Sequence, residues 1–187
     1  MNSFEAMPGA SPGAGLLGLS QRVPPSNLAA EQALLGALLA NNKAFERVGE
    51  YLAPEHFADP VHGRIFHAIK RRVEAGQLAD AVTLRAEFEH SGLLDEVGGP
   101  AYLARLAGAA ISIHAARDYA QTIHDLSLRR ELMKLGDEVR DRARTVGADD
   151  DPQEQIVAAE QSLYSLAEKG KYEGGFKSFV KAALEAV

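Results

Sequence analysis

Residues 114–146, HAARDYAQTIHDLSLRRELMKLGDEVRDRARTV, form a long helical pattern without proline, in which Gly136 is the only glycine. Apolar residues recur along two stripes of this predicted helix: one holds Tyr119, Ile123, Leu126 and Met133, and the other holds Leu128, Leu132, Leu135, Val139 and Val146. A single packed neighbour covers one stripe, so two stripes predict two neighbours.

A second long helix is predicted directly after this one. Asp151, Pro152 and Glu154 supply the N-cap, the first-turn proline and the first-turn acid of a helix start. Ile156, Ala159, Leu163 and Ala167 then share one face. Two long helices joined by a short loop predict an antiparallel helical hairpin, over residues 111–168.

Shorter helical patterns precede the hairpin, over residues 23–110. Asp59-Pro60 marks a clean helix start, and Thr83 is expected to open a later helix. The first pattern places Leu28 and Leu35 on its apolar face, with Glu31 and Gln32 off that face. The predicted fold is all-α, a small multi-helix globular domain followed by a long antiparallel hairpin, and residues 1–22 are expected to form a flexible tail.

Composition excludes several function classes. The chain has 187 residues, and 20 Lys and Arg against 26 Asp and Glu give a net charge of −6, so strong direct binding to nucleic acid is not expected. The absence of cysteine excludes disulfides, thiolate metal sites and cysteine nucleophiles. No membrane span and no secretory signal are recognised, and the expected location is the cytoplasm.

Motifs for catalysis are missing as well. No phosphate-binding loop and no nucleophile elbow occur, and His62 and His67 lie five residues apart, on different faces of a helix. The histidines are therefore interpreted as surface or partly packed residues. The basic runs at residues 70–72 and 129–130 are interpreted as solvated helix surface. We expect no catalytic, cofactor-binding or metal-binding residues, and no enzymatic activity of this chain alone.

One family combines these features in the same order. The chain resembles the N-terminal domain of DnaB-type bacterial replicative helicases from about residue 22 to residue 187. The residues that carry the resemblance are Arg22-Val23-Pro24-Pro25, Ala30-Glu31-Gln32, Leu34-Leu35-Gly36, Phe57, Ile65-Phe66, Thr83-Leu84, Leu94, Val97-Gly98-Gly99, Tyr102-Leu103, Tyr119 and Arg130-Glu131-Leu132. The family's usual proline and asparagine before the long helix are absent, because residues 110–115 read AISIHA.

The resemblance implies a role in assembly. In such helicases, hairpins pair between subunits into a collar above a hexameric motor, and the collar receives the primase. It implies that primase, other helicase subunits and a helicase loader are the partners, and that ATP and magnesium belong only to a motor domain outside this chain. Tyr102, Met133 and Val139 are the candidate primase contacts, whereas Ile123 and Leu126 are the candidates for hairpin pairing.

The C-terminal segment, residues 169–187, is expected to be a polar linker followed by the start of a linker helix. Its apolar residues Phe176, Phe179, Val180 and Leu184 are expected to dock on a neighbouring subunit's motor domain, as the resemblance implies. The pattern breaks off at Val187, so a motor domain with a phosphate-binding loop is expected beyond it. The alternative is a stand-alone helical adaptor or inhibitor that binds helicase subunits.

Overall fold

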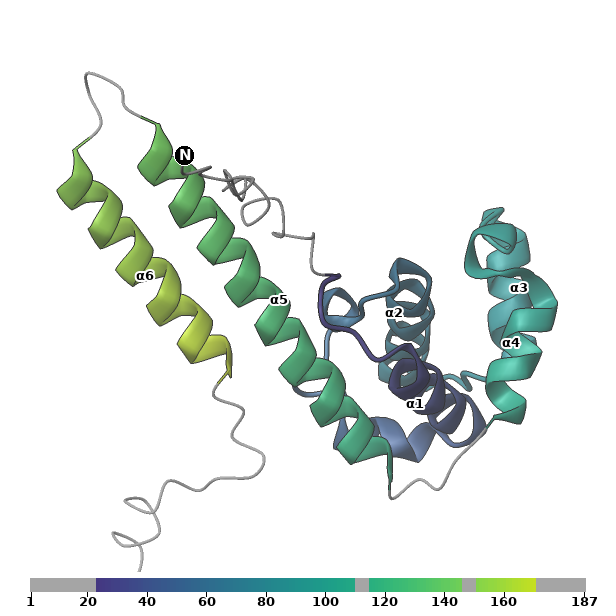
Figure 1. Ribbon diagram of the computed structural model, residues 1–187. Coiled ribbons are helices and arrows are strands. Elements are labelled where there is room, and N and C mark those ends of the chain that lie inside the picture. The colour runs from purple at the N-terminus through teal and green to yellow at the C-terminus, as the bar shows by residue number, and fades with distance from the viewer. Residues whose placement is uncertain (1–22, 110–114, 146–150, 171–187) are drawn as a thin grey trace, which may run out of the picture.

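The computed structural model describes residues 23–109, 115–145 and 151–170, and these ranges contain helices and no strand (Figure 1). The α-helices are α1 (Leu28–Ala40), α2 (Pro60–Glu74), α3 (Ala81–Ser91), α4 (Gly99–Gly108), α5 (Ala116–Arg144) and α6 (Pro152–Gly170). Three short 3-10 helices connect them: η1 (Asn42–Arg47), η2 (Pro54–His56) and η3 (Asp95–Val97). The all-α prediction is confirmed. No helix in the described ranges combines the length and apolarity needed to cross a bilayer.

Helix α1 is the centre of the globular part. It packs against α2, α4 and the first half of α5, and its residues from Ala30 to Leu39 are buried except for Gln32. The prediction that Glu31 lies off the buried face is wrong, and so is the placement of Leu28, which is exposed. A helix surrounded on several sides has no solvent face over its central turns, so its polar residues do not mark an outside.

Helix starts follow the caps that the sequence contains. Asp59 accepts a hydrogen bond from the Val61 N–H at 2.8 Å, and Pro60 follows it as the first residue of α2, as predicted. Helix α3 begins at Ala81, two residues before Thr83, because Asp80 is its N-cap and Thr83 closes a capping box with it. The Thr83 N–H donates to the Asp80 carboxylate and thereby lowers the pKa of that group.

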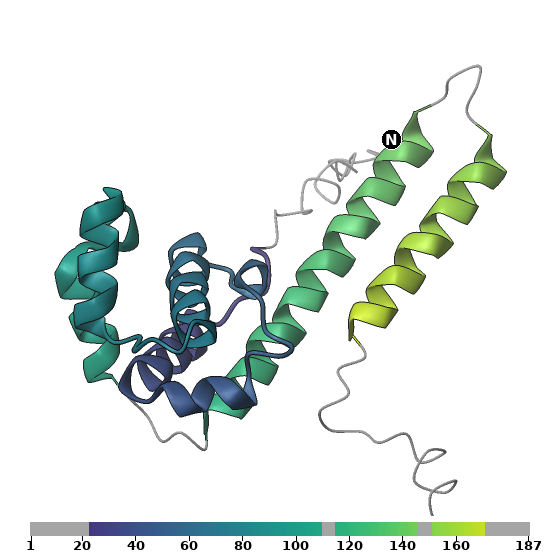
Figure 2. The ribbon, with the colours of Figure 1, turned by 180° about the vertical axis from the view of Figure 1, so that it is seen from behind.

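Helices α5 and α6 form the predicted antiparallel hairpin, which projects from one side of the globular part (Figures 1 and 2). The first half of α5 packs on α1, η1 and η2 and contains the buried residues of that helix, from Ala116 to Ser127. Its second half extends beyond the globular part and packs against α6. Helix α6 continues to Gly170, two residues into the predicted linker. Each apolar stripe of α5 is covered only in part: Tyr119 and Ile123 of one pack on the globular core, and Leu135 of the other lies beside α6. Met133 of the first stripe and Leu132 of the second are exposed.

Candidate functional site on the helical hairpin

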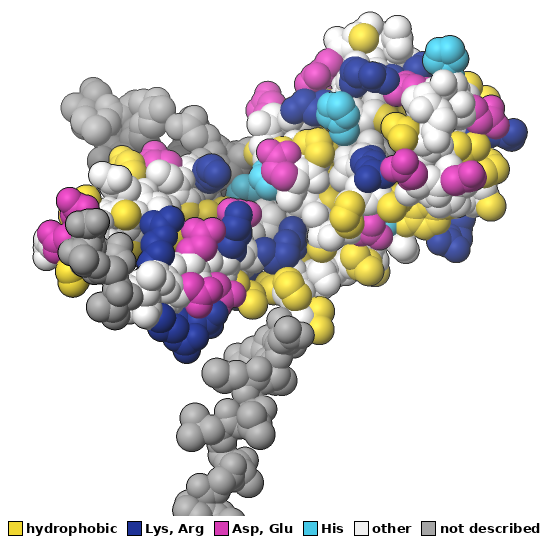
Figure 3. All heavy atoms as spheres, turned by 90° about the horizontal axis from the view of Figure 1, so that it is seen from above, with side chains coloured by type: hydrophobic (Ala, Val, Ile, Leu, Met, Phe, Trp, Pro, Cys, Tyr) yellow, Lys and Arg dark blue, Asp and Glu magenta, His cyan; other side chains and the backbone are white. Residues whose placement is uncertain are grey.

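The hairpin carries apolar side chains that nothing in the described chain covers. Helix α6 has 19 residues, none of them buried. The exposed large apolar residues of the hairpin are Leu132, Met133, Val139, Ile156, Val157, Leu163 and Tyr164. Figure 3 shows hydrophobic side chains between alternating acidic and basic ones over this part of the molecule. Most helical stability in proteins comes from packing an apolar face, so a helix with so little burial indicates a missing neighbour.

Part of this surface forms a groove between the two helices. Leu135 and Val139 of α5 and Ile156 and Leu163 of α6 line it, and its volume is about 340 Å³. Val157 and Tyr164 stand seven residues apart on a neighbouring stripe of α6, and Tyr164 is 68% exposed. We call these exposed apolar side chains of the hairpin the hairpin surface. It offers apolar contacts with charged groups at its edges, which is typical of a protein interface.

The predicted partner-binding residues differ in how far their side chains are exposed. Met133 and Val139 are both 41% exposed and belong to the hairpin surface, so both are available to a partner. Leu126 is half-buried. Ile123 is 1% exposed and packs inside the globular core, where it cannot meet a second hairpin unless the core opens. Ile123 is therefore assigned to the core. The linker residues Phe176, Phe179, Val180 and Leu184 lie outside the described residues.

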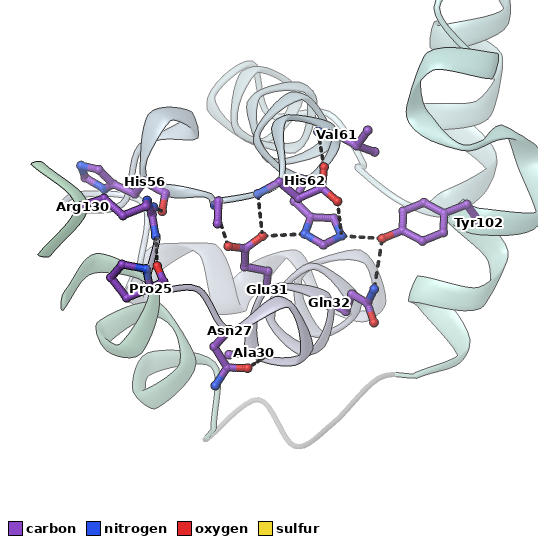
Figure 4. Close-up of polar contacts among 12 residues, drawn as sticks. Pro25, Asn27, Ala30, Glu31, Gln32, His56, Val61, His62, Tyr102 and Arg130 are labelled. Atoms are coloured by element: carbon purple, nitrogen blue, oxygen red, sulfur yellow. Dashed lines mark hydrogen bonds and ion pairs between the residues drawn. The ribbon is translucent and has the colours of Figure 1, made fainter. Parts of the chain in front are cut away.

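Tyr102 lies on α4, and its side chain contacts residues of α1 and α2 in the globular part. Its hydroxyl contacts Nε2 of His62 and accepts a hydrogen bond from the Gln32 side chain at 3.4 Å (Figure 4). The Tyr102 and His62 rings are nearly parallel with centres 6.1 Å apart, and the Arg105 guanidinium lies 4.8 Å from the centre of the Tyr102 ring. Burial raises the pKa of the Tyr102 hydroxyl. Tyr102 therefore has a structural role that is independent of any partner.

The network continues to a buried carboxylate. Nδ1 of His62 lies 2.6 Å from Glu31, which is 2% exposed and also accepts hydrogen bonds from the backbone N–H groups of Ala58 and Asp59 (Figure 4). The carboxylate thus joins α1 to the segment that starts α2, and His62 extends the connection to α4. The interpretation of the histidines as surface or partly packed is wrong for His62 and His124, which are both buried. Helical periodicity missed this network because it contains no information about partners 31 residues apart.

A second polar contact joins the globular part to the base of the hairpin. Arg130 on α5 donates to the backbone carbonyls of Pro25 at 2.9 Å and of His56 at 2.7 Å (Figure 4). It is half-buried, so its interpretation as solvated helix surface is wrong. One guanidinium fork can bind two carbonyls at once, and here it fixes two segments that are distant in sequence on the same helix.

The polar side chains of Glu31, His62, Tyr102 and Arg130 make contacts between elements of the fold. Within the described ranges, no three His, Asp or Glu side chains are grouped so that they could hold a metal ion. Among the buried polar side chains, Glu31 and His62 join α1, α2 and α4, whereas the hairpin surface has no neighbour among the described residues. The fold and this surface define the class of the molecule, an all-helical domain that presents a two-helix arm to solvent.

Comparison with known proteins identifies the family within that class. The chain belongs to the family of the DnaB-like helicase N terminal domain, whose model matches residues 23–125. The crystal structure of the N-terminal domain of DnaB helicase from Mycobacterium tuberculosis aligns with a TM-score of 0.69 and 33% identity, over 76% of this chain and 99% of that one. The resemblance stated from the sequence is confirmed.

Curated relatives are longer than this chain. Replicative DNA helicase DnaB of Rickettsia conorii is 40% identical over 87% of this chain and 32% of its own length, and that of Geobacillus stearothermophilus is 32% identical over 85% and 34%. The chain thus spans about a third of the length of these relatives. A DnaB-like replicative helicase whose structure was described with its interactions with primase shares the fold, with a TM-score of 0.62 and 22% identity, over 86% of this chain and 34% of that one.

Proposed function

We propose that this chain is the non-motor part of a replicative helicase, in which the hairpin assembles subunits into a collar and recruits primase at the replication fork. The observation that carries the proposal is the hairpin surface, which includes an apolar face of α6, a helix with no buried residue among the described part of the chain. The whole protein would unwind duplex DNA with ATP through a motor domain, in the cytoplasm. The described residues of this chain supply contacts between proteins.

Two separate apolar areas support two kinds of partner. The groove residues Val139, Ile156 and Leu163 lie between the helices, whereas Leu132 and Met133 are exposed on α5 alone. We assign α6 and the groove to pairing with a second hairpin, because pairing covers both helices at once. This moves Val139, which was expected to contact primase, to the pairing surface. Met133 is assigned to primase, as one of its contacts.

Self-association of the chain tests the first assignment. Leu163→Asp is expected to weaken association by about 30-fold or more, because a charge would be buried at the centre of an apolar contact. Sedimentation velocity over a range of concentrations measures the change. Gln153→Asp adds the same charge at an exposed polar position of α6 and is expected to leave association unchanged. A wild-type chain that remains monomeric at the highest concentration would contradict the pairing assignment.

Primase binding tests the second assignment. Met133→Asp is expected to weaken binding of the cognate primase about tenfold or more, whereas Met133→Leu keeps the apolar contact and is expected to bind normally. Calorimetric titration measures the affinity, and circular dichroism checks that both variants remain helical. Equal affinity of both variants would remove Met133 from the interface. Tyr102 is unsuitable for this test because its hydroxyl takes part in the buried network.

A further inference from the structure

Two histidine rings meet where η2 packs against α5, at the base of the hairpin. The rings of His56 and His124 lie edge to face, with centres 5.1 Å apart and an interplanar angle of 85°. His124 is 4% exposed, and its Nδ1 is buried without a hydrogen-bond partner. The ring of Tyr51 packs on His124 from another side, with centres 6.0 Å apart. A buried polar nitrogen without a partner is costly and rare, so this one calls for a physical account.

The His56 ring is favoured in its neutral form by a hydrogen bond at the start of η2. Nδ1 of His56 accepts a hydrogen bond from the Ala53 N–H at 3.1 Å, which places the ring proton on Nε2. The pKa of His56 is lowered, first by burial and then by the neighbouring His124, Arg130 and Lys169, while Glu55 opposes the shift. Both the hydrogen bond and the surroundings therefore favour an uncharged imidazole.

We propose that the His56–His124 pair is a pH-sensitive latch, which holds η2 against α5 at neutral pH and opens on acidification. A protonated His56 has no acceptor left for the Ala53 N–H, so that hydrogen bond is lost. A proton on His124 places a second positive charge against the same ring edge. Arg130 binds the His56 carbonyl at this point, so opening of the latch would weaken the contact between the globular part and the base of the hairpin.

The charged groups around the two rings influence the pH at which the latch opens. The titratable and charged residues that surround the two rings are Glu50, Tyr51, Glu55, Asp125, Arg130, Glu131 and Lys169. The Asp125 carboxylate lies 4.0 Å from Nδ1 of His124 but is itself more than half exposed, so water screens its attraction. The nearby carboxylates attract a proton and so favour protonation of the first ring. A second proton would have to be added beside an imidazolium, which repels it. His56, whose pKa is lowered, therefore takes up its proton below the ordinary histidine pKa of about 6.5.

The sign of the pH dependence follows from the lowered pKa of His56. A group whose pKa is lower in the folded protein stabilises the fold fully above its unfolded value. That stability is lost as the pH falls from about 6.5 through the folded value. The latch is thus closed at pH 7.5 and opens in mild acid.

Hydrogen exchange of the full chain at pH 7.5 and 5.5, corrected for intrinsic rates, tests the latch. The protection factors of the Ala53 and Phe57 amides are expected to fall about tenfold at pH 5.5, while that of Leu38 in α1 stays constant. The variant His56→Asn, His124→Phe keeps an acceptor for the Ala53 N–H and cannot be charged, so its protection should not depend on pH. His67→Asn changes an exposed histidine on α2 and should retain the wild-type loss.

A titration of the wild-type histidines by NMR tests the latch without any substitution. His56 is expected to titrate below the ordinary histidine pKa of about 6.5, because burial lowers its pKa. Titration of His56 at or above that value would overturn the proposal. It would also be overturned by constant protection of Ala53 in the wild type, or by an acid loss that persists in the double variant.

Discussion

Glu31→Ala is expected to lower the free energy of unfolding by about 3–5 kcal/mol, because it removes one partner of a buried charged contact. The carboxylate accepts hydrogen bonds from the Ala58 and Asp59 N–H groups and lies against the His62 ring. An alanine would leave these donors buried without partners, in addition to an empty volume beside α1. Urea denaturation followed by circular dichroism measures the change.

Two matched variants make the result specific. Glu46→Ala removes an exposed carboxylate on η1 and is expected to change the free energy of unfolding by less than about 0.5 kcal/mol. Glu31→Gln keeps the volume and one carbonyl acceptor, so its loss should lie between those of the other two variants. If Glu31→Ala were as stable as Glu46→Ala, the contact between α1 and the start of α2 would not depend on this network.

Local signals predicted most of the helices. Asp59-Pro60 and Asp151-Pro152 marked the starts of α2 and α6, and the unbroken pattern of residues 114–146 predicted α5. These predictions succeeded because a cap and a first-turn proline act within a few residues of the helix that they start. The start predicted at Thr83 lies two residues after the observed start of α3. Thr83 is the N3 residue of the capping box, and Asp80 is its N-cap.

Long-range contacts were not predictable from periodicity. Glu31 looked like a solvent-facing residue because the pattern of α1 assumes one buried face, whereas α1 is surrounded. Arg130 bonds to carbonyls 105 and 74 residues away in the sequence, and a basic pair on a helix gives no indication of such partners. The resemblance to a known family suggested the proposed role of the hairpin, which apolar spacing and helix caps alone had predicted only as two helices with two apolar stripes.

Substitution by alanine of Gly36 and Gly136, which both lie inside helices, is expected to have opposite effects, because only Gly36 lies at a close helix contact. A methyl group on Gly36 of α1 would lie 2.4 Å from the backbone carbonyl oxygen of Leu106 in α4, whereas one on Gly136 of α5 would meet nothing within 4 Å. The obstacle at Gly36 is backbone, so no rotamer change can relieve the overlap and the two helices must separate.

The free energies decide the sign of each change. Gly36→Ala gains about 1 kcal/mol of helix propensity, but overpacking in a core costs about 1–3 kcal/mol or more. Because the overlap here is with rigid backbone, we expect the cost to win and the net loss to be about 2 kcal/mol. Gly136→Ala is expected to gain about 0.5–1 kcal/mol, since the exposed helix loses a flexible residue and nothing collides.

Urea denaturation of the two variants beside the wild type measures both changes. The midpoints should move in opposite directions with an unchanged slope, because neither substitution alters the surface exposed on unfolding by much. A stabilised Gly36→Ala would mean that α1 and α4 can separate freely at Leu106. The close approach would then not be what requires glycine at residue 36, and the contact of α1 with α4 would contribute little to holding the globular part together.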